Sequence, residues 1–181
     1  MTTTEDSIAQ FTKDLIAIED KIDAEELKIS SAYRGKLEKL LTERQVILDK
    51  AEGFWPSIFS SPSCALHPFM NGTVDPKIVR AITSFCVSSH QHNEKVSRKV
   101  TMKIRSNLFI QEGVISREID GECNTLALSE IKWKQGTERA RQNSFFSFFE
   151  KHADEDVPKV MDILDVLDSV YQNPFLDLEQ E

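Results

Sequence analysis

The chain has 181 residues, of which 40% are hydrophobic, and a formal net charge of -8. This composition is typical of a folded protein with one or two domains, and no segment is long and apolar enough to predict a bilayer span. The first residues lack the basic and apolar regions of a signal peptide, so we expect a soluble protein that is not secreted. The three cysteines, Cys64, Cys86 and Cys123, form no CxxC motif, and we expect them to be reduced and mostly packed.

Negative charge is concentrated in the carboxyl-terminal part of the sequence. Residues 150–181 contain ten acidic and two basic side chains, whereas residues 1–149 contain 20 of each kind. A concentrated anionic surface attracts cationic partners and speeds their capture. Basic proteins are therefore the leading candidate ligands.

Apolar residues recur in steps of three and four along the first 50 residues, which contain no proline and one glycine. The stripe is interrupted at Glu25, and its members are Ile8, Phe11, Leu15, Ile18, Ile22, Ile29, Tyr33, Leu37, Leu40, Ile47 and Ala51. This spacing predicts one helix over residues 6–51 with a coiled-coil stripe. The alternative is a helical hairpin that is broken near Ser30-Ser31 or Gly35.

A helix of that size would be about 69 Å long, whereas a compact chain of this length has a diameter of roughly 40 Å. We therefore expect the stripe to pack against a second copy in a two-fold symmetric homodimer. The residues expected at the dimer seam are Leu15, Ile18, Ile22, Ile29, Leu37 and Leu40. Residues 1–52 are thus predicted to be a dimerisation helix, and residues 53–181 a separate globular domain.

Helical periodicity ends at Gly53, after which prolines and short alternating apolar runs follow. Asp75-Pro76 predicts a short N-capped helix. Strands are predicted around Phe85 and Val87, over residues 96–110 and 114–119, and as a short pair over residues 126–133. Together they indicate an antiparallel sheet of about four strands, so the fold class is α+β.

Two helical segments are predicted after the sheet. Asn143 or Ser144 can cap the aromatic run of residues 145–149, and Asp156 precedes a helix that Asn173-Pro174 ends. The apolar residues of that last helix are expected to pack on the sheet. Asp162, Asp165 and Asp168 lie between them, three residues apart, and predict an acidic stripe turned to solvent.

The order of short motifs along the chain resembles the nucleosome assembly protein (NAP)/SET family of histone chaperones, particularly its compact SET-like members. After the long helix, the motifs that carry the resemblance are Gly53-Phe54-Trp55, His67-Pro68, Glu130-Ile131-Lys132-Trp133-Lys134, residues 143–149 and Gln172-Asn173-Pro174-Phe175. The resemblance implies a homodimer in which antiparallel long helices form a bridge and each sheet domain forms an earmuff with an acidic underside. Members of the family usually carry a long acidic tail after the position of Glu181, and either this tail is absent or the sequence is trimmed. Without the tail, we expect binding to depend on the folded part.

The resemblance implies a histone chaperone that assists nucleosome assembly or disassembly and performs no chemistry. Its implied location is the nucleus, with shuttling to the cytoplasm as an alternative. Its partners would be the H3-H4 pair, the other core histone pair or an H3 variant. By position in the family pattern, the candidate histone-binding residues are Asp154, Glu155, Asp156, Asp162, Asp165 and Asp168, with Glu118, Asp120 and Glu122 as weaker candidates.

Other functions fit the sequence less well. His90, His92 and Glu94 lack the further ligand of a standard metal site, so no metal or other cofactor is expected. Arg98, Lys99, Lys103 and Arg105 could make a basic strip, but the negative net charge disfavours direct, specific binding of nucleic acid, and a solvated strand face explains the strip. The remaining alternative is a coiled-coil dimeric adaptor for a non-histone nuclear complex.

Overall fold

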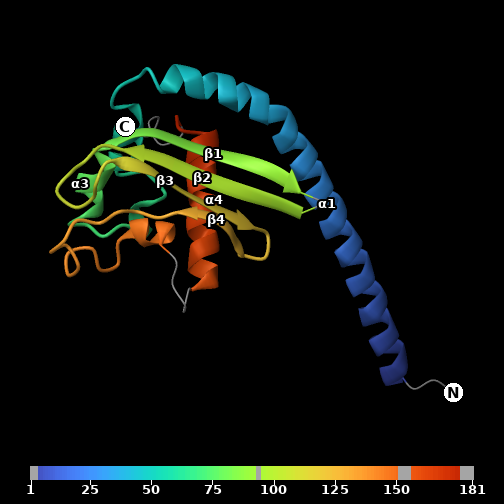
Figure 1. Ribbon diagram of the computed structural model, residues 1–181. Helices are drawn as coiled ribbons and strands as arrows, with labels where there is room; N and C mark the ends of the chain where they lie inside the picture. The colour runs from blue at the N-terminus through green and yellow to red at the C-terminus, as the bar shows by residue number, and fades with distance from the viewer. Residues whose placement is uncertain (1–3, 93–94, 151–155, 176–181) are drawn as a thin grey trace. The chain divides into compact units, whose positions relative to one another are not determined.

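The computed structural model describes residues 4–92, 95–150 and 156–175. In chain order, these residues form a long helix, two short helices with a 3-10 turn between them, four strands, a second 3-10 turn and a final helix. Figure 1 shows their arrangement within the globular part. Their bounds are α1 Thr4–Leu48, α2 Phe54–Ser60, η1 His67–Phe69, α3 Asp75–Val79, β1 Ile82–His92, β2 Lys95–Ile104, β3 Gly113–Asp120, β4 Thr125–Ser129, η2 Phe145–Phe149 and α4 Val157–Gln172. None of the described helices could span a membrane.

α1 is one unbroken helix of 45 residues, which corresponds to about 67 Å of helix. The prediction of a single long helix is confirmed, and the alternative hairpin is wrong, because Ser30, Ser31 and Gly35 all lie inside the helix. One glycine costs a helix about 1 kcal/mol relative to alanine, which is too little to break one this long. The helix therefore presents its stripe continuously.

The part of α1 in the first compact unit, Met1–Leu40, exposes its apolar stripe. Leu37 is half-buried. The other members are between 44% and 67% exposed, and they are Ile8, Phe11, Leu15, Ile18, Ile22, Ile29, Tyr33 and Leu40. Burying such residues stabilises a protein by about 1.5–3 kcal/mol each, so this face of the helix lacks its packing partner within the described chain.

The second compact unit, Leu41–Glu181, begins inside α1 rather than after residue 52. Leu41 and Leu48 are each 8% exposed, and Arg44 donates a hydrogen bond of 2.9 Å to the carbonyl oxygen of Gln172 at the end of α4. The last turns of α1 therefore pack as part of the second compact unit.

The four strands form one antiparallel sheet in the order β1-β2-β3-β4, as predicted. Phe85, Met102 and Ile115 occupy neighbouring positions across β1, β2 and β3, and all three are buried, so one face of the sheet is core. β2 ends at Ile104, earlier than expected. The final predicted pair of strands is wrong because only β4 forms, while Trp133 makes an isolated bridge with Ile110.

Helix α4 packs against β1 and β2, and Figure 1 shows it running across the strands. An aromatic cluster joins α2, β1 and α4: the ring of Phe85 lies 4.9 Å from Trp55, 5.0 Å from Phe59 and 5.8 Å from Tyr171, measured between centroids. The prediction that the last helix covers the sheet is confirmed.

The ends of the carboxyl-terminal helices follow the sequence closely. The Ser144 side chain accepts from the Phe146 N–H at the start of η2, and Asp156 accepts from the Lys159 N–H at the start of α4. The predicted cap of α3 is wrong, because Val74 occupies the N-cap position and Asp75 lies within the helix. Burial gives Asp75 a different role, described below.

Candidate functional site

The candidate acidic stripe lies on α4, whose apolar residues are buried against the sheet. Asp162 is exposed, and 63% of the Asp165 side chain is exposed. Asp156 is also exposed, although its carboxylate caps the helix. These three carboxylates are the part of the predicted site that α4 presents to solvent.

The prediction that Asp168 faces solvent is wrong. Its side chain is only 14% exposed, and one carboxylate oxygen lies 3.8 Å from the Arg98 guanidinium. The same guanidinium lies 2.6 Å from Asp165. A side chain three residues further along a helix is rotated by about 60° when a turn has 3.6 residues, so the stripe curves from solvent towards the sheet.

Arg98 was expected in a solvated basic strip with Lys99, Lys103 and Arg105, and this expectation is wrong for Arg98. Arg98 lies two and four residues before Val100 and Met102 in β2, so all three side chains face the same side of the sheet. Val100 and Met102 are buried, so Arg98 lies on the face that α4 covers. Lys99 and Lys103, at the alternate positions of β2, face the other side of the sheet. The alternation of side chains along a strand could have predicted from the sequence which face Arg98 occupies.

The acidic candidates in the sheet have mostly structural roles. Asp120 is 8% exposed, and its carboxylate accepts from the N–H groups of Glu122 and Asn124 and from the Asn124 side chain, which holds the β3–β4 turn. Glu118 accepts from the Ser97 hydroxyl at 2.7 Å and is the register partner of Lys99. Glu122 is exposed. The Asp120 carboxylate therefore holds the β3–β4 turn, whereas Glu122 is the exposed candidate of this group.

Charges in the described part of the second unit balance, with 15 acidic and 15 basic residues. Asp154 and Glu155, the remaining two candidates, lie outside the described residues. Those two residues immediately precede Asp156 in the sequence, so part of the negative excess of this unit adjoins the start of α4. The candidate acidic surface is thus narrower than predicted, and α4 supplies its described part.

Two charged side chains in the core hold the fold. Arg117 is 1% exposed and donates to the Thr125 hydroxyl and to the Phe148 carbonyl. Asp75 is fully buried and accepts from the Phe145 N–H at 2.9 Å, the Asn71 N–H at 2.7 Å and the Ser144 hydroxyl. Burial raises the pKa of the Asp75 carboxyl, and these hydrogen bonds oppose that shift.

The described residues contain no group of three side chains that could hold a metal ion. The His90 Nε2 atom lies 3.0 Å from the Ser88 hydroxyl. Glu94 lies outside the described residues.

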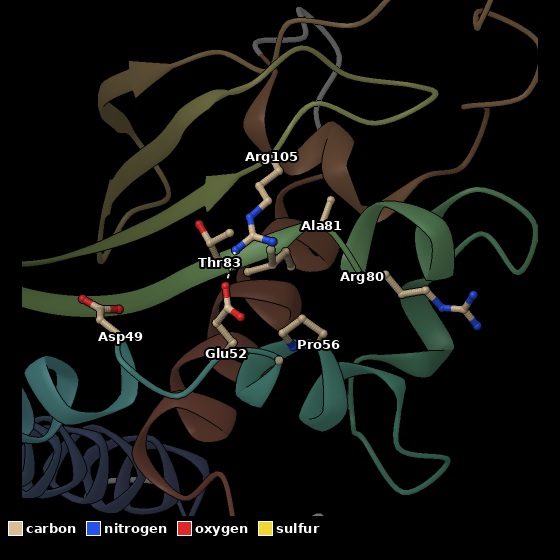
Figure 2. A pocket seen from close by; sticks show the side chains of 9 residues that line it. Asp49, Glu52, Pro56, Arg80, Ala81, Thr83 and Arg105 are labelled. Atoms are coloured by element: carbon tan, nitrogen blue, oxygen red, sulfur yellow. Dashed lines mark hydrogen bonds and ion pairs between the residues drawn. The ribbon is translucent and has the colours of Figure 1, made fainter.

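A hollow of about 480 Å³ lies where the chain passes from α1 to α2 beside β1 (Figure 2). Across it, Arg105 pairs with Glu52 at 2.9 Å, and both side chains are largely exposed. Asp49 accepts from Ser84, and Arg80 points away from the Glu52–Arg105 pair in Figure 2. A catalytic site requires its charged groups to converge on one point, and the charged groups that line this hollow do not.

No protein-family model and no curated protein sequence matches this chain. The crystal structure of Ccp1 is similar, with a TM-score of 0.68 and 16% identity, over 96% of this chain and 98% of Ccp1. A nucleosome assembly protein from Plasmodium falciparum gives a TM-score of 0.58 and 15% identity, over 97% of this chain and 96% of that one. Nucleosome Assembly Protein 1 from Plasmodium knowlesi gives 0.53 and 16% identity, with the same coverage of 97% and 96%.

Proposed function

From the premise that this chain has the fold of the nucleosome assembly proteins, we propose that it is a histone chaperone acting in the nucleus. It would bind core histones and assist the assembly or disassembly of nucleosomes, without performing chemistry on them. The observation that carries the proposal is the fold itself, which matches the Plasmodium falciparum protein over 97% of this chain and 96% of that chain. The sequence motifs described above support it independently.

Histone capture would depend on the exposed carboxylates at the start and on the outer side of α4. Asp156, Asp162 and Asp165 belong to this surface, and the acidic residues Asp154 and Glu155 precede it in the sequence. Histone lysines and arginines bind DNA phosphates largely through charge, so an anionic protein surface competes for the same side chains. Binding is therefore expected to weaken as the salt concentration rises.

A homodimer would supply the packing partner that the exposed stripe of α1 lacks. Two copies that pair through this stripe would bury Leu15, Ile18, Ile22, Ile29 and Leu40, which are between 44% and 67% exposed in the single chain. Leu37, which is half-buried, completes the proposed seam. The dimer would present two acidic surfaces to a histone pair.

The charge balance of the described second unit favours one alternative, a dimeric adaptor for a non-histone nuclear complex. The adaptor would share the homodimer but would show no preference for histones.

Equilibrium binding separates the two functions. The purified protein is titrated with the H3-H4 pair and with the other core histone pair at two salt concentrations, and light scattering gives its mass in the same samples. Tight, salt-dependent binding by a dimer supports the chaperone. A dimer that binds neither histone pair at moderate salt contradicts the chaperone and leaves the adaptor.

A further inference from the structure

A guanidinium group from the sheet already lies on the acidic surface of α4. The Nη1 atom of Arg98 is 2.6 Å from the carboxylate of Asp165 and 3.8 Å from that of Asp168. Arginine is also the side chain with which a basic protein pairs most closely with carboxylates, because its N–H groups match their geometry. Arg98 thus makes, within the chain, the contact that an arginine of a bound basic protein could make.

The strand holds this guanidinium in place. In the sheet, Arg98 lies between Ser89 of β1 and Ile119 of β3, so its main chain belongs to the middle of the sheet rather than to an edge. Its side chain is 24% exposed, whereas that of Asp165 is 63% exposed. The charged end of Arg98 therefore meets Asp165 where the covered side of α4 gives way to the exposed side.

The two aspartates differ in how a ligand can reach them. Asp165 is open to solvent, so an approaching cation can contact its carboxylate beside Arg98. The Asp168 side chain is only 14% exposed, and Arg98 lies next to it. Residues three apart on a helix are neighbours, so one cation can pair with both carboxylates. In the unbound chain that cation is Arg98, and it offsets one of their two negative charges.

We propose that Arg98 competes with the arginines of a bound partner for Asp165 and Asp168, and thereby limits the affinity of the α4 surface for arginine-rich proteins. A ligand arginine displaces the Arg98 guanidinium from Asp165, and the released group turns to solvent. Ion pairs with exposed carboxylates are weak, so the exchange of one guanidinium for another meets little resistance. This inference rests on the proposed function, because it concerns the same surface and adds the residue that tunes it.

A competing role differs from a purely structural one in the sign of its effect on binding. An ion pair that only holds α4 on the sheet leaves ligand affinity unchanged, or lowers it, when the pair is removed. A competitor raises the affinity when it is removed, because two carboxylates become available. Affinity for a cationic probe therefore separates the two roles.

A synthetic hexa-arginine peptide is the probe, and its binding to the full-length protein is measured by calorimetric titration at low salt. Arg98→Gln removes the charge and keeps a polar side chain. We expect it to tighten binding roughly three- to tenfold. Lys99→Gln is the matched control, because it removes one positive charge from the next position of β2, on the other side of the sheet, and should change the affinity less than about twofold. No tightening by Arg98→Gln, or equal tightening by both variants, overturns the inference.

A second background separates competition for the carboxylates from repulsion at a distance. In a chain that carries Asp165→Asn with Asp168→Asn, Arg98 has neither of its two carboxylates to cover. Adding Arg98→Gln to this chain should therefore give no further gain in affinity for the peptide. A gain as large as in the wild-type background would mean that Arg98 merely repels the peptide, and it overturns the inference. Urea denaturation shows whether each variant is folded.

An observation on the wild type does not depend on any variant. With isotope-labelled protein and unlabelled peptide, nuclear magnetic resonance follows the side-chain Nε–H signal of Arg98, which is assigned through its correlation with the Arg98 main chain. We expect this signal to shift, and its exchange with water to accelerate, as the peptide saturates the protein. A signal that stays unchanged at saturation means that Arg98 remains on the aspartates, which overturns the inference.

Titration with the two core histone pairs keeps this inference separate from the proposed function. If Arg98→Gln tightens peptide binding while neither histone pair binds the wild type or the variant, the proposed function fails and the competition on α4 stands. If the histone pairs bind, but Arg98→Gln tightens neither their binding nor that of the peptide, the competition alone fails.

Discussion

The guanidinium of Arg44 donates a hydrogen bond to the main-chain carbonyl of Tyr171 and lies 5.0 Å from the centroid of that residue's ring. It also donates to the carbonyl of Gln172, while the Tyr171 hydroxyl donates to the carbonyl of Leu41 at 3.4 Å. The last carbonyl groups of a helix lack partners within it and carry partial negative charge, which a cation satisfies. These contacts therefore join the carboxyl-terminal end of α1 to that of α4.

We expect Arg44→Ala to destabilise the second unit by about 2–3 kcal/mol, because it removes charge-assisted hydrogen bonds, a contact with an aromatic ring and a favourable helix-end charge. Urea denaturation at a fixed protein concentration measures this loss. Arg139→Ala, which removes an exposed arginine of the same unit, is the matched control and should change stability by less than about 0.5 kcal/mol. Equal effects of the two variants would contradict the structural role of Arg44.

The sequence predicted the elements whose signals are local. The unbroken α1 follows from its periodicity, and the caps at Ser144 and Asp156 follow from side chains that bond to the nearby backbone. The contact between Arg44 and α4 joins residues 128 positions apart, and no local pattern carries it. For the same reason, the sequence did not reveal that the globular unit starts within α1.

The candidate site was less predictable, because exposure depends on neighbours from other elements. Three aspartates at spacing three looked alike, yet Arg98 from β2 pairs with two of them and draws Asp168 towards the sheet. The sequence did carry one signal: Arg98 and Val100 are two residues apart in β2, so both side chains face the same side of the sheet. Nothing in the sequence near Asp75 indicates that its carboxylate will bind the start of η2.

Asp75 provides a pH-dependent test, because burial raises the pKa of its carboxyl in the folded state above its ordinary value of 3.8. A raised pKa means that the folded protein binds the proton more tightly, so this group contributes stability that is present at low pH and lost as pH rises through the folded-state pKa. Asp75→Asn cannot titrate. We expect the unfolding free energy of the wild type, minus that of Asp75→Asn, to increase as pH falls from 7 towards 4.

Urea denaturation of both proteins at several pH values gives this difference. Asp162→Asn, at an exposed position, serves as the control and should show a much flatter difference over the same range. A difference for Asp75→Asn that shrinks on acidification would mean that its hydrogen bonds outweigh burial and lower the pKa. Asp75→Ala should be destabilised at every pH by about 3 kcal/mol, since it leaves the Asn71 and Phe145 N–H groups without acceptors.

The aspartates of α4 should separate into binding and structural residues. We expect Asp162→Asn with Asp165→Asn to weaken histone binding roughly three- to tenfold at low salt, since it removes two exposed charges that would contact histone cations. Asp168→Asn should instead cost about 1 kcal/mol of stability, because its half-buried carboxylate pairs with Arg98. Fluorescence titration measures the affinity, and urea denaturation measures the stability.

Glu112→Gln with Glu138→Gln is the control for the loss of two exposed charges elsewhere on the same unit. If this control weakens histone binding as much as the α4 variant does, the effect comes from net charge and the α4 surface is not the site.

The exposed stripe of α1 predicts how the dimer can be broken without unfolding the globular unit. Ile18→Glu with Ile22→Glu places two carboxylates in each chain on a surface that the dimer buries, and an unpaired buried charge costs several kcal/mol. We expect light scattering to give the mass of a monomer. Ala17→Glu with Ala24→Glu adds the same charges on the opposite side of the helix, where both alanines are exposed, and should remain a dimer. If the seam variant stays dimeric, the stripe is not the interface; if both variants dissociate, added negative charge alone is the cause.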